Sequence, residues 1–449
     1  MSKNRISRRG FLGKVGGAAA AFTIVSPHVL GGPGKQAPSD KLNIAGIGVG
    51  GMGNTNIRNM SSENIVALCD VDHRYAAHCF KQHPKARTYT DYRKMLDESK
   101  DIDAVLIATP DHTHAVIAMA AIKAGKHVYC QKPLCHNVWE ARELAKAAKA
   151  AGVTTQMGIQ GHSSNSTRMI VEWIESGAIG EVREVDAWCN LTYYPWGHAY
   201  WSSKWSRRPK EAMPKPDHMD WDLWIGPAPM RPYHRAYHPQ SWRCWWDFGS
   251  GMMGDRGAHT IDPVFWSLKL GAPTSIEATS AGNSREVHPI SAIVTYNFPE
   301  RGKLPPVKLT WYEGTRAPRP KELEDGRTLG DSQGGALFKG TKGMLMCGVY
   351  GNGARLIPES AMKGFTPPPK TIPRVKTSHE MDFIDNCKAG KPAGADFSYS
   401  GPLVEVCQLG NLAKRMDTRL EWDAKNLTVT NNPKANKYIH PEYRKGWKL

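Results

Sequence analysis

KLNIAGIGVGGMGNTNIRNMSSENIVALCD, residues 41–70, is the stretch that decides the fold of this chain. It begins with an apolar run, Leu42 to Ile47, that predicts a buried parallel strand. A glycine-rich turn, a short helical stretch and a second apolar run, Ile65 to Cys69, follow. These parts, in this order, predict the first strand–helix–strand unit of a doubly wound sheet.

The glycine-rich turn is the first candidate binding element. Glycines allow a tight turn and let backbone N–H groups approach a pyrophosphate at a helix N-terminus. A glycine-rich turn without a ligand is the alternative, but the surrounding strands and helix favour a dinucleotide site. The residues expected to hold the cofactor here are Gly48, Gly50, Gly51, Met52 and Gly53.

Asp70 ends the second strand and lies 22 residues after Gly48. An acidic side chain at this position can accept a hydrogen bond from a ribose 2′-OH. The same carboxylate would repel a 2′-phosphate, which favours NAD as the cofactor over NADP. Arg74 lies nearby and keeps NADP as the less favoured alternative.

From Lys41 to Gly161, apolar runs alternate with segments of helical pattern. This alternation predicts a parallel, doubly wound sheet, the Rossmann arrangement, so we expect an NAD-binding Rossmann domain over 41–161. Strands are expected at 42–47, 65–69, 104–108, 127–130 and 153–159, and helices at 52–60, 73–82, 91–98, 114–124 and 138–151.

Two later strands of this domain run into polar residues. The third strand is followed by Thr109-Pro110-Asp111-His112-Thr113-His114, and the fourth by Gln131-Lys132-Pro133. Ligands gather at the carboxyl ends of such strands, so the turn after the third strand should face the nicotinamide half of the cofactor, and Lys132 should lie beside the nucleotide. Lys132 is a candidate proton carrier or electrostatic aid, unless it is a surface lysine, and the Lys132–Pro133 bond is a candidate cis bond. Loop capping is the alternative role for His112 and His114.

Residues 162–449 no longer show the regular alternation of strands and helices and are expected to form a second domain. Runs such as 292–298, 307–312 and 344–347 predict a largely antiparallel sheet. Helices are expected at 166–176, 379–387 and 403–416, with a strand beginning near 181 and a Pro-rich connector over 358–373. Ten of the fifteen tryptophans fall between Trp188 and Trp266, and we expect most of them to build a core and a minority to stack on a sugar ring.

Asp255 and His259 are four residues apart at the start of an expected helix that runs to about Leu270. On one helix face, the carboxylate could orient the imidazole and raise its pKa, and the pair could accept the proton of a substrate hydroxyl. A helix-surface Asp–His pair is the alternative. A metal site is less favoured, because neither this pair nor His234 with His238 belongs to a closed set of ligands.

The bulk composition excludes some classes of protein. The net charge is +17, but the basic residues are scattered, which favours a basic enzyme over a nucleic-acid-binding protein and is compatible with an acidic sugar. The nine cysteines form no Cys-x-x-Cys pair, so buried free thiols are expected rather than disulfides.

The N-terminal 40 residues are expected to be a signal and linker rather than part of the fold. Ser7-Arg8-Arg9-Gly10-Phe11-Leu12-Gly13 is a twin-arginine motif, and the apolar region after it, about 15–25, is short for a membrane span. We therefore expect a periplasmic or otherwise exported protein without a stable membrane anchor.

The glycine fingerprint, the turn from Thr109 to His114, the Gln131-Lys132-Pro133 motif and the Asp255-xxx-His259 pair together resemble the glucose–fructose oxidoreductase/inositol dehydrogenase (Gfo/Idh/MocA) family. The resemblance covers 41–449. It implies a Rossmann domain followed by an α/β domain whose open sheet forms the substrate cleft, and it implies a homo-oligomer. It also implies that Lys132 and His259 are catalytic, that Asp255 assists, and that the cofactor is held by Gly48, Gly50, Gly51, Met52, Gly53, Asp70, Thr109, Pro110, His114, Gln131 and Lys132. The family usually has Glu where this chain has Gln131, and losing that charge should lower the pKa of Lys132.

Three functions follow from these patterns. The first is an NAD(P)-dependent oxidoreductase that passes hydride from a secondary alcohol of a sugar or glycoside to a tightly bound nicotinamide. The second is a redox-neutral NAD-dependent glycosidase. It would oxidise the glycoside transiently, eliminate the aglycone, add water and reduce the sugar again. Such a cycle suits an exported protein that cannot exchange its cofactor. The third is a non-catalytic nucleotide-binding protein, which Gln131 alone supports.

Overall fold

A computed structural model describes residues 40–192 and 205–449, and Leu42–Leu449 belong to one structural unit. The twin-arginine motif, the apolar region after it, Trp196 and Trp201 lie outside the described residues. Within the described part of the chain, each helix is too short or too polar to cross a membrane.

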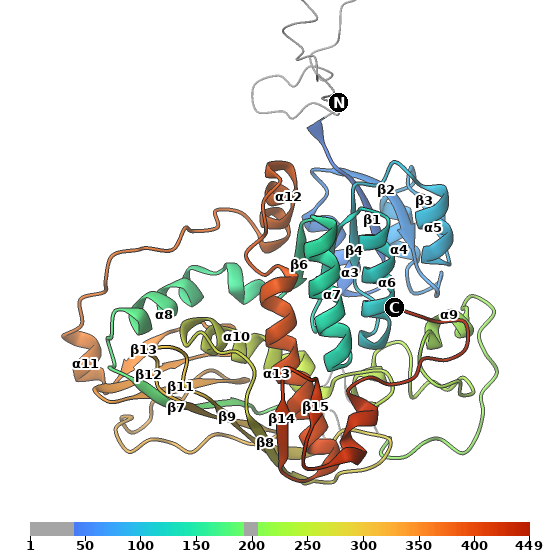
Figure 1. Cartoon of the computed structure of the whole chain (residues 1–449). Coiled ribbons are helices and arrows are strands. Elements are labelled where there is room, and N and C mark those ends of the chain that lie inside the picture. Colours follow the sequence, from blue (N-terminus) through green and yellow to red (C-terminus); the bar gives the residue numbers. More distant parts are fainter. Residues whose placement is uncertain (1–39, 193–204) are drawn as a thin grey trace, which may run out of the picture. The chain divides into compact units, whose positions relative to one another are not determined.

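The N-terminal sheet is the predicted Rossmann sheet (Figure 1). Its six strands are all parallel, in the order β3-β2-β1-β4-β5-β6. Five of them were expected, and β3 was not, because Arg87, Thr88 and Tyr89 form a short edge strand with no buried residue. The strands are β1 (Asn43–Ile47), β2 (Asn64–Cys69), β3 (Arg87–Tyr89), β4 (Ala104–Ile107), β5 (His127–Gln131) and β6 (Thr155–Gly158).

Three of the helices that alternate with these strands begin at other residues than expected, and α5 differs only by one residue, at Tyr92 rather than 91. Helix α4 begins at Ala77 rather than 73, since the Asp72 carboxylate accepts from the Tyr75 amide in a preceding turn. Helix α6 begins at Asp111 rather than 114, because its polar first turn is buried and hydrogen-bonded rather than exposed. The helices are α3 (Met52–Asn59), α4 (Ala77–Gln82), α5 (Tyr92–Glu98), α6 (Asp111–Lys123) and α7 (Val138–Ala151).

The second sheet is larger and mostly antiparallel, as predicted (Figure 1). Its order is β13-β12-β11-β7-β10-β9-β8-β14-β15, and β7 with β10 is its parallel pair. Its strands are β7 (Val182–Cys189), β8 (Ser275–Ala281), β9 (Ser291–Phe298), β10 (Val307–Glu313), β11 (Gly334–Gly340), β12 (Gly343–Cys347), β13 (Arg355–Ile357), β14 (Leu420–Asp423) and β15 (Thr428–Val429).

Helix α13 links the two sheets, because it packs on α7 of the Rossmann half and on β8 of the second sheet. It begins at Phe397, six residues before the expected start, and so includes Pro402 in its second turn. The expected connector over 358–373 likewise contains a short helix, α11. The other helices here are α8 (Asn165–Glu175), α9 (Trp221–Ile225), α10 (Ala258–Ser267), α11 (Glu359–Lys363) and α12 (His379–Ala389).

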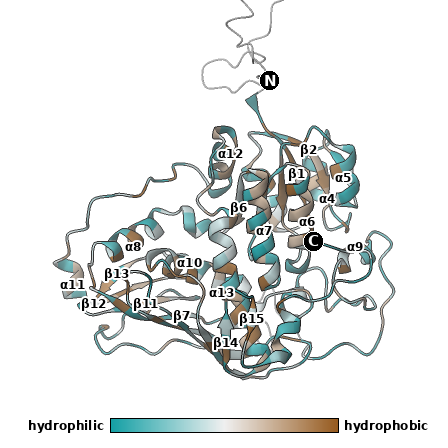
Figure 2. Ribbon diagram, viewed as in Figure 1, coloured by the Kyte–Doolittle hydropathy of each residue, from teal (hydrophilic) through white to brown (hydrophobic). Residues whose placement is uncertain are grey.

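The core is apolar where the two sheets and α13 meet, and the outer helix faces are hydrophilic (Figure 2). Trp188, Trp245 and Trp311 are fully buried in the interior. All nine cysteines are buried and free, which confirms the prediction of thiols without disulfides. The many tryptophans therefore serve mainly as core, and only a few remain for a binding site.

Candidate active site

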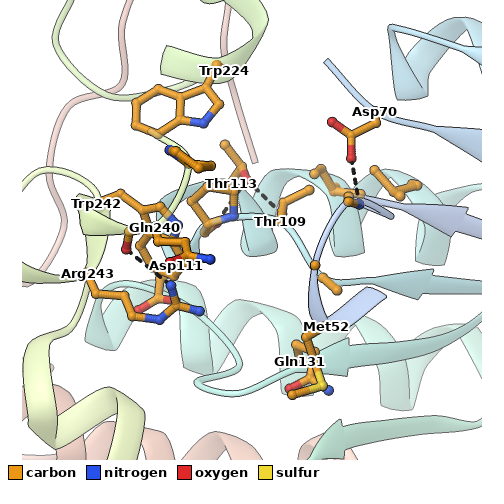
Figure 3. Close-up of a pocket in the computed structure, with 18 of the residues that line it drawn as sticks. Met52, Asp70, Thr109, Asp111, Thr113, Gln131, Trp224, Gln240, Trp242 and Arg243 are labelled. Carbon is orange, nitrogen blue, oxygen red and sulfur yellow. Dashed lines mark hydrogen bonds between the residues drawn. The ribbon is translucent and has the colours of Figure 1, made fainter. Parts of the chain in front are cut away.

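A cavity follows the carboxyl ends of the Rossmann strands and continues beneath residues of the C-terminal region (Figure 3). All the predicted site residues except Gly53 and His114 line it. From the Rossmann half they are Gly48, Gly50, Gly51, Met52, Asp70, Thr109, Pro110, Gln131 and Lys132, and from the C-terminal half they are Asp255 and His259.

The glycine turn has the shape that a dinucleotide needs. Gly48 has a φ of +77°, and a Cβ there would lie 2.7 Å from the Thr109 nitrogen. A Cβ on Gly50 would lie 2.1 Å from the Tyr75 ring. No side chain caps the N-terminus of α3, so its first N–H groups are available to an anion at this turn.

Gly53 does not line the cavity and has a structural role instead. A Cβ on Gly53 would lie 2.1 Å from the Gly48 carbonyl oxygen, so the absence of a side chain lets α3 pack closely against the turn. This is the role of the third glycine in a Rossmann fingerprint. The expectation that Gly53 itself contacts the cofactor is therefore replaced by an indirect contribution.

Asp70 faces the glycine turn. Its carboxylate accepts from the Gly50 amide at 3.1 Å (Figure 3) and from the Asp72 amide at 2.9 Å. Burial raises the pKa of Asp70 to about 6, against the lowering effect of these hydrogen bonds. The side chain is thus placed where a ribose hydroxyl could donate to it.

His114 does not line the cavity, contrary to expectation. Its ring is 1% exposed, and its Nδ1 and Nε2 lie 2.8 Å from the carbonyl oxygens of Pro133 and Thr109. Burial lowers its pKa to about 4. The imidazole therefore ties together the two strand-end turns that hold Thr109 and Lys132, rather than contacting a ligand.

His112 has a similar buried position. Its ring nitrogens lie 3.2 Å from the Phe248 oxygen and 3.0 Å from the Trp224 oxygen, so it joins α6 to the C-terminal half. Burial lowers the pKa of His112 to about 3. The capping alternative therefore describes both histidines better than a direct role at the nicotinamide.

Lys132 and Asp255 form an ion pair at the meeting point of the two halves. The Lys132 ammonium also donates to the backbone oxygen of Asp255 at 3.0 Å, which leaves one of its three N–H groups for a ligand. Burial lowers the pKa of Lys132, and the adjacent Asp255 carboxylate opposes that shift. The Lys132–Pro133 bond is cis, as predicted.

The predicted pairing of Asp255 with His259 is wrong, because the carboxylate binds Lys132 instead. Burial would raise the pKa of Asp255, but the nearby Lys132, Arg243 and Arg256 together hold it well below its usual range. The turn from Met253 to Gly257 is π-helical rather than α-helical, so residues four apart no longer lie directly above one another. Such turns are frequent at functional sites.

His259 is 4% exposed, and its ring centroid lies 4.6 Å from that of Tyr350. Its Nδ1 has no hydrogen-bond partner among the residues described. Burial and the charge of Lys132 lower the pKa of His259 well below its usual value, which is opposite to the predicted rise. A neutral imidazole with an unpartnered nitrogen can accept a proton.

Gln131 belongs to a buried polar chain beneath the site. Its side-chain amide donates to the Asn56 oxygen at 2.9 Å, and the Asn56 amide donates to the Glu380 carboxylate at 2.8 Å. The pKa of Lys132 is lowered, as expected from Gln131, but burial is its largest cause. Gln131 also supports the Lys132 amide, which donates to its Oε1 at 3.3 Å.

Several cavity residues were missed by the sequence analysis. Arg243 and Arg256 lie 4.0 and 3.9 Å from the Asp255 carboxylate, and Figure 3 places Arg243 and Trp242 on the C-terminal wall. Their neighbours on the wall are Trp224, His238, Gln240 and Tyr350. Arg256 could have been noticed inside the Asp255–His259 motif, whereas Tyr350 lies in an unrelated loop that carries no local signal.

Comparisons with known proteins agree with this geometry. Residues 42–159 match the model "Oxidoreductase family, NAD-binding Rossmann fold", and 164–300 match "Oxidoreductase family, C-terminal alpha/beta domain", both of the Gfo/Idh/MocA group. The two matches together span more than half of the chain.

Two curated relatives each align with less than a third of the chain. Levoglucosan dehydrogenase of Pseudarthrobacter phenanthrenivorans is 31% identical over 115 residues, which is 26% of this chain and 29% of that protein. Inositol 2-dehydrogenase of Salmonella typhimurium is 31% identical over 147 residues, which is 31% of this chain and 43% of that protein. The chain thus spans less than half the length of these relatives.

Solved structures share the fold over most of the chain. The WlbA dehydrogenase from Bordetella pertussis in complex with NADH and UDP-GlcNAcA has a TM-score of 0.59 and 18% identity, covering 85% of this chain and 99% of that one. Levoglucosan dehydrogenase in complex with NADH has a TM-score of 0.57 and 17% identity, covering 84% and 98%. At such identities the likeness concerns the fold alone.

Proposed function

The chain belongs to the Gfo/Idh/MocA family of NAD(P)-dependent oxidoreductases, and from this premise we propose that it oxidises a secondary alcohol of a sugar or glycoside with a tightly bound NAD. Relatives named for levoglucosan and inositol support a carbohydrate substrate. Asp70 supports NAD, because a 2′-phosphate would meet its carboxylate.

The observation on which this proposal rests is the convergence of Lys132, Asp255 and His259 in one buried corner of the cavity. The remaining N–H of Lys132 can hold the oxygen of the reacting hydroxyl, and Asp255 fixes the ammonium in place. His259 lines the cavity and is neutral, so its imidazole takes the hydroxyl proton. Bound NAD supplies the acceptor for the hydride that leaves the same carbon.

The test is the variant His259→Asn, assayed for NAD reduction with a panel of aldoses, inositols and glycosides. Loss of the base should lower turnover about 10²–10⁴-fold, the usual contribution of a general base. His78→Asn, at an exposed histidine on α4, is the matched control and should keep full activity. Full turnover in the His259 variant would refute the assignment.

A second candidate is redox-neutral glycoside cleavage, and the twin-arginine motif at Ser7–Gly13 favours it. An exported enzyme has little free NAD for exchange, so a cycle that restores its own cofactor suits that compartment. Product analysis separates the two candidates: free sugar and aglycone without net NADH would support cleavage, whereas accumulating NADH would support simple oxidation.

We also propose export by the twin-arginine route. Replacing both arginines of the motif, Arg8→Lys with Arg9→Lys, should leave the protein in the cytoplasmic fraction. Equal recovery of both proteins outside the cytoplasm would contradict this proposal.

A further inference from the structure

The segment Ile439–Leu449 runs from the C-terminal sheet to the Rossmann half, where the chain end lies beside α6 (Figure 1). The Arg444 side chain fixes it to α9, donating to the Asp222 carboxylate at 2.6 Å and to the Gly226 carbonyl at 3.0 Å. The Tyr443 hydroxyl donates to Glu140 at 2.6 Å, and Lys123 of α6 donates to the Leu449 carbonyl at 3.1 Å. The segment is therefore anchored to α9 on one side and to the Rossmann helices α7 and α6 on the other.

This anchoring places Trp447 on the wall of the cofactor cavity, beside Tyr92 and Leu223. The Trp447 and Tyr92 ring centroids are 6.5 Å apart, and the Arg93 guanidinium carbon lies 5.0 Å from the Trp447 ring. The indole is half-buried. An aromatic ring on the wall of a nucleotide cavity can stack on a base.

The position along the sheet identifies which half of a dinucleotide would lie there. Tyr92 follows β3, and Asp70 follows β2, at one edge of the order β3-β2-β1-β4-β5-β6. Lys132 follows β5, on the opposite side of the glycine turn. Trp447 is therefore at the adenosine end of the cavity, away from the reacting carbon.

Trp224 gives a second, independent sign of a ligand in this cavity. It stacks on Trp221 at 4.6 Å, is 2% exposed, and lines the cavity across from Asp70 (Figure 3). Its indole N–H has no hydrogen-bond partner among the residues that the structure describes. A buried donor is rarely left unsatisfied, so a ligand acceptor is its expected partner.

We propose that Trp224, on α9, and Trp447, in the segment Ile439–Leu449, form an adenosine clasp that keeps the dinucleotide bound between turnovers. Trp447 covers the adenine, and the Trp224 N–H donates to an acceptor of the adenosine half. Arg444 is a positioning residue, because it holds the segment against α9. The clasp rests on the proposed function, since it assumes that the cavity holds a nicotinamide dinucleotide.

The test measures the NAD content of the purified full-length protein and the rate at which bound NADH leaves when excess NAD is added. Trp447→Ala should release NADH about tenfold faster or more, the scale of one base–aromatic stack. Trp224→Phe keeps an aromatic side chain but removes the N–H together with one ring, and should accelerate release by about three- to tenfold. Arg444→Ala should act in the same direction as Trp447→Ala without touching the cavity.

Lys448→Ala is the matched control, because Lys448 is exposed and adjacent to Trp447, and it should retain NADH as the unaltered protein does. Circular dichroism and the melting temperature show whether each variant is folded. If the unaltered protein neither contains nor binds NAD or NADP, the proposed function fails. If it holds the cofactor and the folded tryptophan variants release it at the unaltered rate, the clasp is wrong while the function stands.

Discussion

The two ends of the cofactor cavity are built from different kinds of groups. The adenosine end has backbone N–H groups at the glycine turn, the Asp70 carboxylate and an aromatic face at Trp447. The nicotinamide end has buried charges, with Lys132 and Asp255 paired next to a neutral His259. N–H groups, rings and a carboxylate that accepts from a hydroxyl bind a ligand without altering it, whereas a buried ion pair beside an imidazole can move a proton.

This difference separates binding from chemistry along one cavity. Groups at the adenosine end should set cofactor affinity and residence, and groups at the nicotinamide end should set turnover. A variant at one end that altered cofactor affinity and turnover equally would show that the two ends are not separate. A variant that altered only one of these properties would support the separation.

The largest expected effect is at Lys132. Lys132→Met removes the ammonium that holds the substrate oxygen, so turnover should fall about 10²–10⁴-fold while NAD stays bound. Because this variant leaves the buried Asp255 without its partner, Lys132→Arg provides a folded comparison that keeps the ion pair and should still lose activity. Single-turnover NAD reduction and NAD content are the measurements.

Lys94→Met, at an exposed lysine of α5, is the control for Lys132 and should behave as the unaltered protein. Turnover by Lys132→Arg at the unaltered rate would mean that any cation suffices there. Loss of bound NAD from both Lys132 variants would mean that the two ends are not separate.

The next effect is at Asp70, at the other end. Asp70→Ser removes the charge that would meet a 2′-phosphate, and the preference for NAD over NADP should fall about 10- to 100-fold. Equilibrium binding of both cofactors measures this change. An unaltered preference would show that Asp70 does not face the ribose. A fall in turnover at saturating NAD would show that the adenosine end also affects the chemistry.

A smaller effect concerns pH. Burial raises the pKa of Asp70 to about 6, so the carboxylate becomes protonated as the pH falls through 6 and loses its acceptor for the ribose hydroxyl. Affinity for NAD should therefore be full above about pH 7 and weaken below pH 6 by at most about tenfold per pH unit. Asp70→Asn should flatten this dependence in a titration followed by NADH fluorescence.

Local signals explain which parts of this cavity could be predicted. The glycine turn, β1 and β2 are neighbours in sequence, and their apolar runs and spacing carry the information directly. The nine-stranded sheet was predicted only in outline, because short strands such as Arg355–Ile357 have too few residues to show a period.

Tertiary pairing explains the rest. Lys132 and Asp255 are 123 positions apart in sequence, so their ion pair could not be inferred from the motif that joins Asp255 to His259. The burial of His259 and the nearby charge of Lys132 reversed the expected pKa shift, and neither is visible in residue spacing. Trp447 reaches the cavity only because Arg444 docks on α9, more than two hundred residues earlier.

The smallest effect on chemistry concerns Gln131, which lies beneath the nicotinamide end. Gln131→Glu introduces the family's usual residue, but a carboxylate cannot donate to Asn56 Oδ1, and Asn56 already directs its amide to Glu380. The variant should lose about 1–3 kcal/mol of unfolding free energy, the cost of an unsatisfied buried group, with a few-fold change in turnover at most.

Exchanging the residues at the two ends of the hydrogen-bonded series Gln131–Asn56–Glu380 gives the decisive form of this test. In Gln131→Glu combined with Glu380→Gln, the Asn56 amide can turn over, donate to the new carboxylate and accept from the new amide, so denaturant unfolding should recover most of the lost stability. Glu380→Gln alone should destabilise less than Gln131→Glu, since the glutamine Oε1 can still accept from the Asn56 amide. If the double variant loses the sum of the unfolding free energies lost by the two single variants, the three side chains do not form one hydrogen-bonded network. Recovery of stability with unaltered turnover would show that Gln131 supports Lys132 from below and takes no part in the chemistry.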